Sequence, residues 1–291
     1  MNDGGAAAPV DASGATQVLR QAAELIREDP IRRGCTLHFG NAGQLVMTGD
    51  LHGNLRNFEK LRKFCALERS PARFVILHEL IHCELSSPAD LDLSIDLLIR
   101  AAAWKCAFPD NVFFLQSNHE LAQLTGQEIT KGGRSVLRDF ERGVAYRFGP
   151  AAGDVLDAVR EYIAALPLAA RTGNGIFCSH SLPDEFTAQN FDPAMLTREP
   201  TPGELAPGGP AYAMVWGRFQ RPEFLDRFAE RVGARIFVVG HTPQETGYNV
   251  VGRMIILASD HNHGTFLTID LSKLLDVEEL LWSVRKFVSI E

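Results

Sequence analysis

Short apolar runs that alternate with helical patterns are the feature of this sequence that most limits its possible folds. Between many of the runs, apolar residues recur at helical spacing, in the segments Asn54–Cys65, Ala89–Ala107, Val136–Phe148, Gly153–Ala165 and Pro222–Val232. The runs themselves have the length and composition of strands: Thr36–Phe39, Gln44–Thr48, Phe74–Leu77, Val112–Gln116, Gly175–Cys178, Ile236–Val239, Met254–Ala258 and Thr265–Ile269. This alternation predicts a layered α/β fold, with central β-sheets flanked by helices.

The two ends of the chain differ from this pattern. Residues 1–15 are rich in Gly, Ala, Ser and Asp without periodicity, which predicts a flexible tail, with the first helix near Gln17–Arg27. No internal repeat or clear linker divides the rest, so we expect 16–291 to form a single domain. The segment Asp192–Pro210 is rich in Pro and Gly and predicts a long functional loop. Leu271–Val288 is interpreted as a helix that packs on the core.

Composition narrows the class of protein. The chain has 291 residues and a net charge of −7, which argues against a nucleic-acid partner, because a surface that follows phosphates needs basic residues. No apolar run reaches the eighteen or so residues of a membrane span, and the N-terminus lacks a signal sequence, so we expect no membrane partner and a cytoplasmic location. The five scattered cysteines are interpreted as free thiols.

Polar residues rich in histidine follow most of the predicted strands. Eight of the nine histidines lie in these segments, and His38 is the exception. The segments are Gly49-Asp50-Leu51-His52-Gly53-Asn54, His78-Glu79-Leu80-Ile81-His82-Cys83-Glu84, Ser117-Asn118-His119-Glu120, Ser179-His180-Ser181, Gly240-His241-Thr242 and Ser259-Asp260-His261-Asn262-His263-Gly264. Carboxylates, an amide and imidazoles without paired thiolates suit Mn, Fe or Zn, with donors enough for two ions. Any one of these histidines alone could equally be a hydrogen-bonded core residue.

The order of these motifs resembles the calcineurin-like metallophosphoesterases, and specifically the phosphoprotein phosphatase family of serine/threonine phosphatases. The resemblance runs from about Val46 to Gly264. It rests on Gly-Asp-Leu-His-Gly, Ser-Asn-His-Glu, Ser-His-Ser and Gly-His-Thr in that order, and is supported by the segments Phe113–Glu120, Leu166–Ala170 and Val215-Trp216. The resemblance implies the metallophosphoesterase fold and a phosphatase that uses two divalent metal ions.

The resemblance also implies roles for single residues. Asp50 and His52 are expected to bind the first metal ion, and Asn118, His180 and His241 the second. His119 is expected to act as general acid beside the leaving oxygen, which suits an imidazole. A hydroxide held by both metals is expected to attack phosphorus directly, without a phosphoenzyme.

The second motif of the family, Gly-Asp-x-x-Asp-Arg-Gly, is altered here. Glu79 stands where the family has the Asp that bridges both metals, and is expected to bridge them, the alternative being that it points away. His82 replaces the Asp that orients the catalytic histidine, and an imidazole stabilises a neighbouring imidazolium poorly. Glu84 or Glu120 is a candidate for the missing carboxylate. Cys83 replaces the Arg that holds the phosphoryl oxygens.

Three arginines are candidates to replace that cation: Arg218, Arg221 and Arg56, each of which could instead be a surface residue. Asp260, His261 and His263 are candidates for additional donors near the metals. The leading functional hypothesis is a phosphoesterase acting on a phosphorylated protein or a small phosphoester. The alternatives are a dinucleoside polyphosphate hydrolase and a degenerate phosphatase that binds a phosphorylated partner without turnover.

Overall fold

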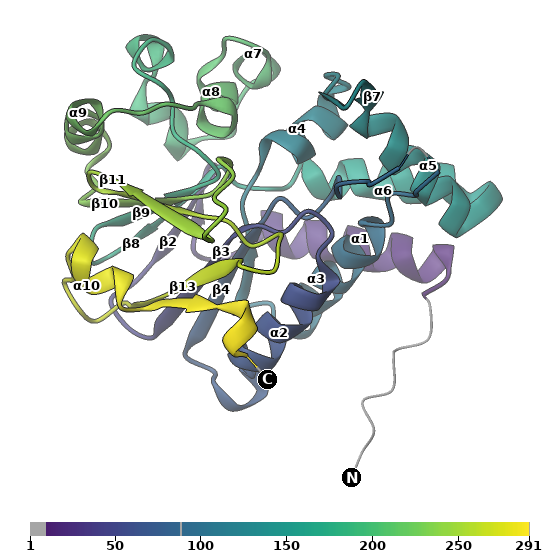
Figure 1. Cartoon of the computed structure of the whole chain (residues 1–291), viewed down its shortest axis with the longest axis horizontal. Helices are drawn as coiled ribbons and strands as arrows, with labels where there is room; N and C mark the ends of the chain where they lie inside the picture. Colours follow the sequence, from purple (N-terminus) through teal and green to yellow (C-terminus); the bar gives the residue numbers. More distant parts are fainter. Residues whose placement is uncertain (1–9, 88, 291) are drawn as a thin grey trace.

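The computed structural model describes residues 10–87 and 89–290. Two β-sheets lie face to face at the centre, and helices cover the outer face of each (Figure 1). The expected layered α/β architecture is confirmed. No helix among the described residues is long and apolar enough to span a membrane.

The larger sheet has the strand order β1-β2-β8-β9-β10-β12-β11. Strands β9, β10 and β12 are parallel neighbours, so their carboxyl ends meet at one edge. The strands are β1 (Arg32–Arg33), β2 (Thr36–Phe39), β8 (Ala169–Thr172), β9 (Ile176–Ser179), β10 (Ile236–Val239), β11 (Tyr248–Val251) and β12 (Met254–Leu257). The sequence pattern did not predict β1, β8 and β11.

The smaller sheet has the order β14-β13-β3-β4-β5. Strands β3, β4 and β5 are parallel, while β13 and β14 add to the β3 side in antiparallel pairing. The strands are β3 (Gln44–Asp50), β4 (Arg73–His78), β5 (Val112–Phe114), β13 (Thr265–Asp270) and β14 (Val284–Lys286). A short hairpin, β6 (Thr130–Lys131) with β7 (Arg134–Ser135), stands apart from both sheets.

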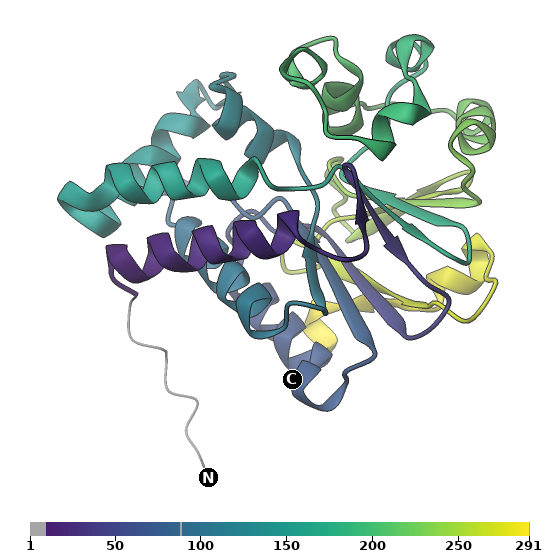
Figure 2. The ribbon, with the colours of Figure 1, turned by 180° about the vertical axis from the view of Figure 1, so that it is seen from behind.

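Alternation along the strands builds the layers. On β3, Leu45 and Met47 point toward the larger sheet and join the core between the sheets, whereas Val46 joins the core beneath the helices. The helices are α1 (Ala12–Arg27), α2 (Leu55–Cys65), α3 (Ile95–Ala107), α4 (Asn118–Thr125), α5 (Val136–Phe148), α6 (Ala152–Ile163), α7 (Pro202–Leu205), α8 (Pro210–Trp216), α9 (Pro222–Val232) and α10 (Val277–Leu281). Single 3₁₀ turns cover Leu67–Arg69, Gly149–Ala151, Thr187–Asn190, Pro193–Thr197 and Phe287–Ser289. Helices α1 and α6 lie side by side on the outer face of the smaller sheet (Figure 2).

Two sequence-based expectations need correction. Helix α1 begins at Ala12, because the Asp11 side chain accepts a hydrogen bond from the amide of Gly14 and so caps the helix within the segment expected to be a tail. Residues 1–9 of that segment lie outside the described residues. The C-terminal helix expected over Leu271–Val288 is reduced to α10, after which the chain forms the edge strand β14 against β13.

The two sheets are joined where their strands end. Asp50, the last residue of β3, forms a parallel bridge with Ala258, directly after β12. The amide of Ser259 donates to the carbonyl of Asp50, and the hydroxyl of Ser259 accepts from the amide of Gly49. This contact brings the carboxyl ends of β3 and β4 next to those of β9 and β10, where the histidine-rich segments lie.

Candidate metal centre

The carboxylate of Glu79 is the centre of the site. It follows β4 directly, is 1% exposed, and its two oxygens face imidazole nitrogens from three other segments. Its Oε2 lies 2.8 Å from Nε2 of His180, while its Oε1 lies 3.5 Å from Nε2 of His119 and 3.8 Å from Nε2 of His52. Three groups of side chains place donor atoms close together: Asp50, His78 and His180; His52, Glu79 and His119; Glu79, His180 and His241.

Hydrogen bonds to carbonyl oxygens determine which imidazole nitrogens carry protons. Nδ1 of His52 lies 3.1 Å from the carbonyl of Ile81, which can only accept, so Nδ1 is the protonated nitrogen and Nε2 keeps a lone pair. The Nε2 of His52 is the nitrogen that faces Glu79. His52 is therefore presented to the centre as a ligand.

The same reasoning applies to His180 through a second histidine. Nε2 of His78 donates to the carbonyl of Thr48 at 2.9 Å, so in the neutral ring Nδ1 of His78 is an acceptor. It lies 2.9 Å from Nδ1 of His180, which must then be the donor. Nε2 of His180 is left with a lone pair that faces Glu79 Oε2 and, at 2.7 Å, the Asn118 side-chain oxygen.

A second pair of histidines fixes the orientation of the His119 ring. Nε2 of His82 lies 2.9 Å from Oε1 of Gln123, and Nδ1 of His82 lies 2.9 Å from Nδ1 of His119. Because the Gln123 oxygen accepts, His82 accepts in turn from Nδ1 of His119. The lone pair of His119 then lies on Nε2, toward Glu79 Oε1.

These contacts favour a cation at the centre. Both Glu79 oxygens are buried without a hydrogen-bond partner among the described residues, although three imidazole nitrogens approach them. A buried carboxylate that faces only lone pairs is costly unless a positive charge lies between them. The donor set, carboxylate and imidazole with one amide oxygen, suits divalent transition metals. The residues therefore fit the metal ions that the sequence implies.

His241 and Asp50 complete the centre from the two sheets. The backbone amide of His241 donates to Oδ1 of Asp50 at 2.9 Å, and Nδ1 of His241 lies 3.0 Å from the Asn118 oxygen. Oδ1 of Asp50 lies 3.6 Å from Nδ1 of both His78 and His180. Asp50 thus groups with these two histidines, whereas His52 groups with Glu79 and His119.

Burial controls the protonation of the centre. It lowers the pKa of His52 and His78 to about 3 and that of His82 to about 4, and it is also the main cause that lowers the pKa of His119, His180 and His241. The imidazoles are therefore neutral at pH 7. Burial, followed by a neighbouring carboxylate, raises the pKa of Asp50 and Glu79 well above their usual values. A bound divalent ion opposes that effect by stabilising the anionic carboxylates.

The backbone is strained at the same residues. His52, Glu79, His82 and His241 have φ of 41°, 51°, 62° and 65°, a region that non-glycine residues seldom adopt and that costs about 1–3 kcal/mol each. At Gly240, a Cβ atom would collide with Oδ1 of Asp50 and the ring of His78, so only glycine fits beside His241. Strain concentrated in this way is typical of functional sites.

Of the three candidate arginines, Arg218 is the one that reaches the centre, donating from Nε to Nε2 of His241 at 2.9 Å. Arg221 lies on the surface, where it pairs with Glu185, and Arg56 is exposed in the first turn of α2. Neither contacts the three donor groups in the part of the chain that the structure describes.

The other candidate residues have mainly structural contacts. Glu120 accepts from the amide of Leu80 and the hydroxyl of Ser117, and so supports the loop after β4 instead of His119. Glu84 lines a neighbouring pocket. His261 contacts the carbonyl of Gln244, and within residues 10–87 and 89–290 neither it, His263 nor Asp260 joins a donor group.

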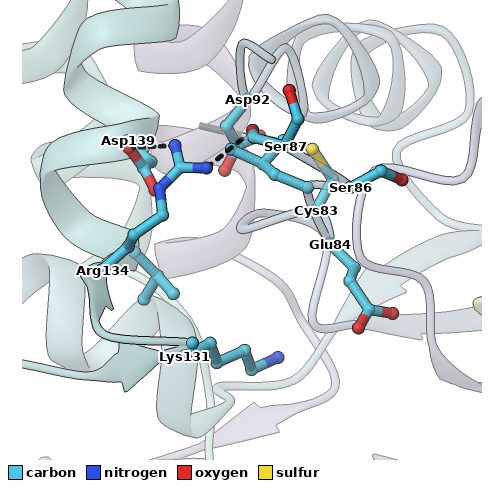
Figure 3. Close-up of a pocket in the computed structure, with 11 residues that line it drawn as sticks. Cys83, Glu84, Ser86, Ser87, Asp92, Lys131, Arg134 and Asp139 are labelled. Carbon is cyan, nitrogen blue, oxygen red and sulfur yellow. Dashed lines mark hydrogen bonds and ion pairs between the residues drawn. The ribbon is translucent and has the colours of Figure 1, made fainter. Parts of the chain in front are cut away.

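A pocket of about 300 Å³ lies beside the centre, between the loop after His82 and the β6–β7 hairpin (Figure 3). Cys83 lines it, and burial followed by the Asp92 carboxylate raises the pKa of this thiol to about 12, so Cys83 supplies no charge. Lys131 of the hairpin lines it as well. The Lys131 charge acts on the centre, where it is the cause second to burial in lowering the pKa of His52.

The sequence alone assigned no role to three residues of this centre: His78, Gln123 and Lys131. His78 is a histidine at the end of a predicted strand, but its position before Glu79 matches no ligand of the family motif. Gln123 comes one helical turn after His119, a spacing that places both side chains on one face of α4. Lys131 carried no signal, since it belongs to a hairpin with no periodic pattern.

Comparison with known proteins places this geometry in context. Residues 44–245, well over half of the chain, match the family model described as calcineurin-like phosphoesterase. No curated protein matches the chain significantly. A protein serine/threonine phosphatase from Saccharomyces cerevisiae, with similarity to human phosphatase PP5, shares 14% identity over 89% of this chain and 83% of its own, with a TM-score of 0.69. A cold-active protein-tyrosine phosphatase of a psychrophilic Shewanella species shares 14% identity over 86% and 80%, with a TM-score of 0.58. At this identity the two structures establish a shared fold.

Proposed function

The chain belongs to the calcineurin-like phosphoesterase family and is a metal-dependent phosphoesterase, and from this premise we propose that it hydrolyses phosphate monoesters of the phosphoserine and phosphothreonine type, with two divalent ions bound. The observation that carries the proposal is the buried Glu79 carboxylate, which faces imidazole lone pairs on both of its oxygens. Bound cations would make that arrangement favourable with the carboxylate ionised.

The proposed ligands divide between the two oxygens of Glu79. His52 lies on the Oε1 side, and His180, with Asn118 and His241 beside it, on the Oε2 side. Asp50 borders the second group through His180. Ions bound there would supply Lewis acidity for in-line displacement at phosphorus and would ionise an attacking water.

We propose that two cationic side chains, on opposite sides of the metal centre, bind the substrate. Arg218 stands beside His241, and Lys131 acts electrostatically on His52, Glu79 and His119. Together they replace the single arginine that the family has where this chain has Cys83. Positive charge on both flanks would hold the equatorial oxygens of the phosphoryl group.

His119 and His82 stay in the proposed reacting centre. As a general acid, His119 would have to donate from Nε2. Its hydrogen bond to His82 places the proton of the neutral ring on Nδ1, and His82 carries no negative charge to stabilise a second proton. The acid role remains a prediction, and the geometry favours another use of the same nitrogen.

The decisive experiment combines metal analysis with turnover. The Mn²⁺-loaded protein is expected to contain two ions per chain and to hydrolyse p-nitrophenyl phosphate and a phosphoserine peptide. Glu79→Ala is expected to lose at least one ion and most of the rate, whereas Glu278→Ala, an exposed acidic control, keeps both. Faster turnover of diadenosine tetraphosphate than of any monoester would favour the dinucleoside polyphosphate alternative. Phosphopeptide binding without turnover would identify a degenerate phosphatase.

A further inference from the structure

Three nitrogen lone pairs converge on Glu79, and one of them belongs to His119. The evidence is the same for all three: His52 donates its proton to the Ile81 carbonyl, and His180 and His119 each donate theirs to a second histidine. In each case Nε2 is left bare and faces a Glu79 oxygen. No feature of this geometry separates His119 from the two expected ligands.

The orientation of His119 is fixed through two further residues. Gln123 donates from its amide nitrogen to the Glu141 carboxylate at 3.4 Å, which leaves its oxygen facing His82. His82 is 1% and His119 5% exposed, so water does not compete for these hydrogen bonds. An aspartate in place of His82 would attract a proton to His119, whereas an imidazole anchored by Gln123 only accepts one hydrogen bond.

The distances suit a shared ion. Nε2 of His119 and Nε2 of His52 lie 3.5 and 3.8 Å from the same Glu79 oxygen. Donor atoms at about 2.1 Å from a tetrahedral metal are about 3.4 Å apart. The two rings also approach each other, with centroids 4.8 Å apart at 77°. Small side-chain movements would bring all three atoms to bonding distance.

We propose that His119 is a ligand of the first metal ion, together with His52 and Glu79. The inference depends on the proposed function only in its requirement for bound divalent metal. The Glu79 side chain, longer than the aspartate of the family motif, reaches the His119 ring, and the His82–Gln123 pair turns that ring's lone pair toward the metal. Two departures of the second motif, at Glu79 and His82, then serve one altered coordination sphere.

The test is a metal titration of the full-length protein after chelation and dialysis, using Co²⁺ and following its visible absorption and the bound metal content. His119→Ala is expected to lose one ion, or to bind it at least 100-fold more weakly, as His52→Ala should. His263→Ala, an exposed histidine outside the donor groups, is expected to behave as wild type. Two ions bound to His119→Ala with wild-type affinity would overturn the inference.

A second variant distinguishes the loss of a metal ligand from misfolding. His119→Cys is expected to retain the ion and to show a thiolate-to-Co²⁺ charge-transfer band that wild type lacks, which can arise only if position 119 contacts the metal. The absence of that band in a Co²⁺-loaded, folded variant would contradict the inference. If wild type binds two ions but hydrolyses no phosphoester, the proposed function fails while the titration still decides the role of His119. If wild type binds no Co²⁺, both are wrong.

Discussion

Nδ1 of His78 lies 2.9 Å from Nδ1 of His180, and this contact between two buried rings decides which nitrogen of His180 faces the metal centre. His78→Leu would remove the acceptor and leave the His180 ring free to adopt either tautomer. Loss of such a supporting hydrogen bond usually weakens metal binding about 10–100-fold. We expect His78→Leu to lose this much affinity for one of the two ions, as measured by competition with a fluorescent chelator.

The control for His78 is His38→Leu, which changes an exposed histidine on β2. Thermal melting without metal would show whether the His78→Leu fold is intact. Unchanged affinity for both ions in a folded His78→Leu protein would mean that the His180 ring is oriented by other contacts.

Arg218 is expected to compete with metal for His241. Because the arginine donates to Nε2, the neutral His241 ring carries its proton on Nδ1, the nitrogen that faces Asn118 and His180. Metal binding at Nδ1 requires that proton to leave and Arg218 to move. Arg218→Met should therefore tighten binding of the second ion about tenfold, as expected for a charged hydrogen bond, and weaken inhibition by inorganic phosphate.

Arg221→Met is the matched control for Arg218, since it removes the same charge from an exposed ion pair. It should change neither the affinity for the second ion nor the inhibition by inorganic phosphate. Weaker metal binding in Arg218→Met would show that this arginine supports the site in its loaded form.

Lys131→Met should raise the KM for phosphate monoesters and the Ki of inorganic phosphate about fivefold, corresponding to the loss of about 1 kcal/mol from the charge interaction of an exposed lysine. Arg138→Met, an exposed residue in the first turn of α5, provides the control. Steady-state kinetics with phosphate as inhibitor measure both constants. Equal effects of the two substitutions would assign Lys131 only to the general surface charge.

The buried pair of Lys105 and Asp29 should be important for stability. Lys105 is 1% exposed, donates to Asp29 at 2.9 Å and to the Pro109 carbonyl at 2.7 Å, and lies 4.7 Å from the Phe113 ring centre. Lys105→Ala leaves a buried carboxylate unpaired and should lower the free energy of unfolding by about 3 kcal/mol or more. Urea denaturation measures the change, and Lys273→Ala, in an exposed pair with Asp270, should change it by less than about 1 kcal/mol.

Much of the fold could be predicted because its strands are short apolar runs with clear ends. Ile236–Val239 and Thr36–Phe39 agree with the structure to the residue. Strand β14 could not be predicted, since three residues, two of them charged, give no pattern and form a strand only by pairing with β13. The prediction of a C-terminal helix over Leu271–Val288 was wrong for the same reason, because pairing across the sheet overrides local propensity.

The site could be predicted as a set of residues but not as a network. His52, Glu79, His119, His180 and His241 are gathered as the motifs implied, because parallel strands end at one edge. Which nitrogen each ring presents depends on contacts such as that of His78 with His180, 102 residues apart in the chain. Spacing within a motif carries no information about such contacts.

The bridge between Asp50 and Ala258 has a consequence for folding kinetics. Its two residues are separated by most of the chain, so the entropy of closing a very long loop must be overcome before the edge exists. The donor group of Glu79, His180 and His241 takes its residues from both sheets. Binding of the second ion is therefore expected late in folding, after both sheets have docked, and slow exchange of the Ser259 and His241 amide protons would report that docking.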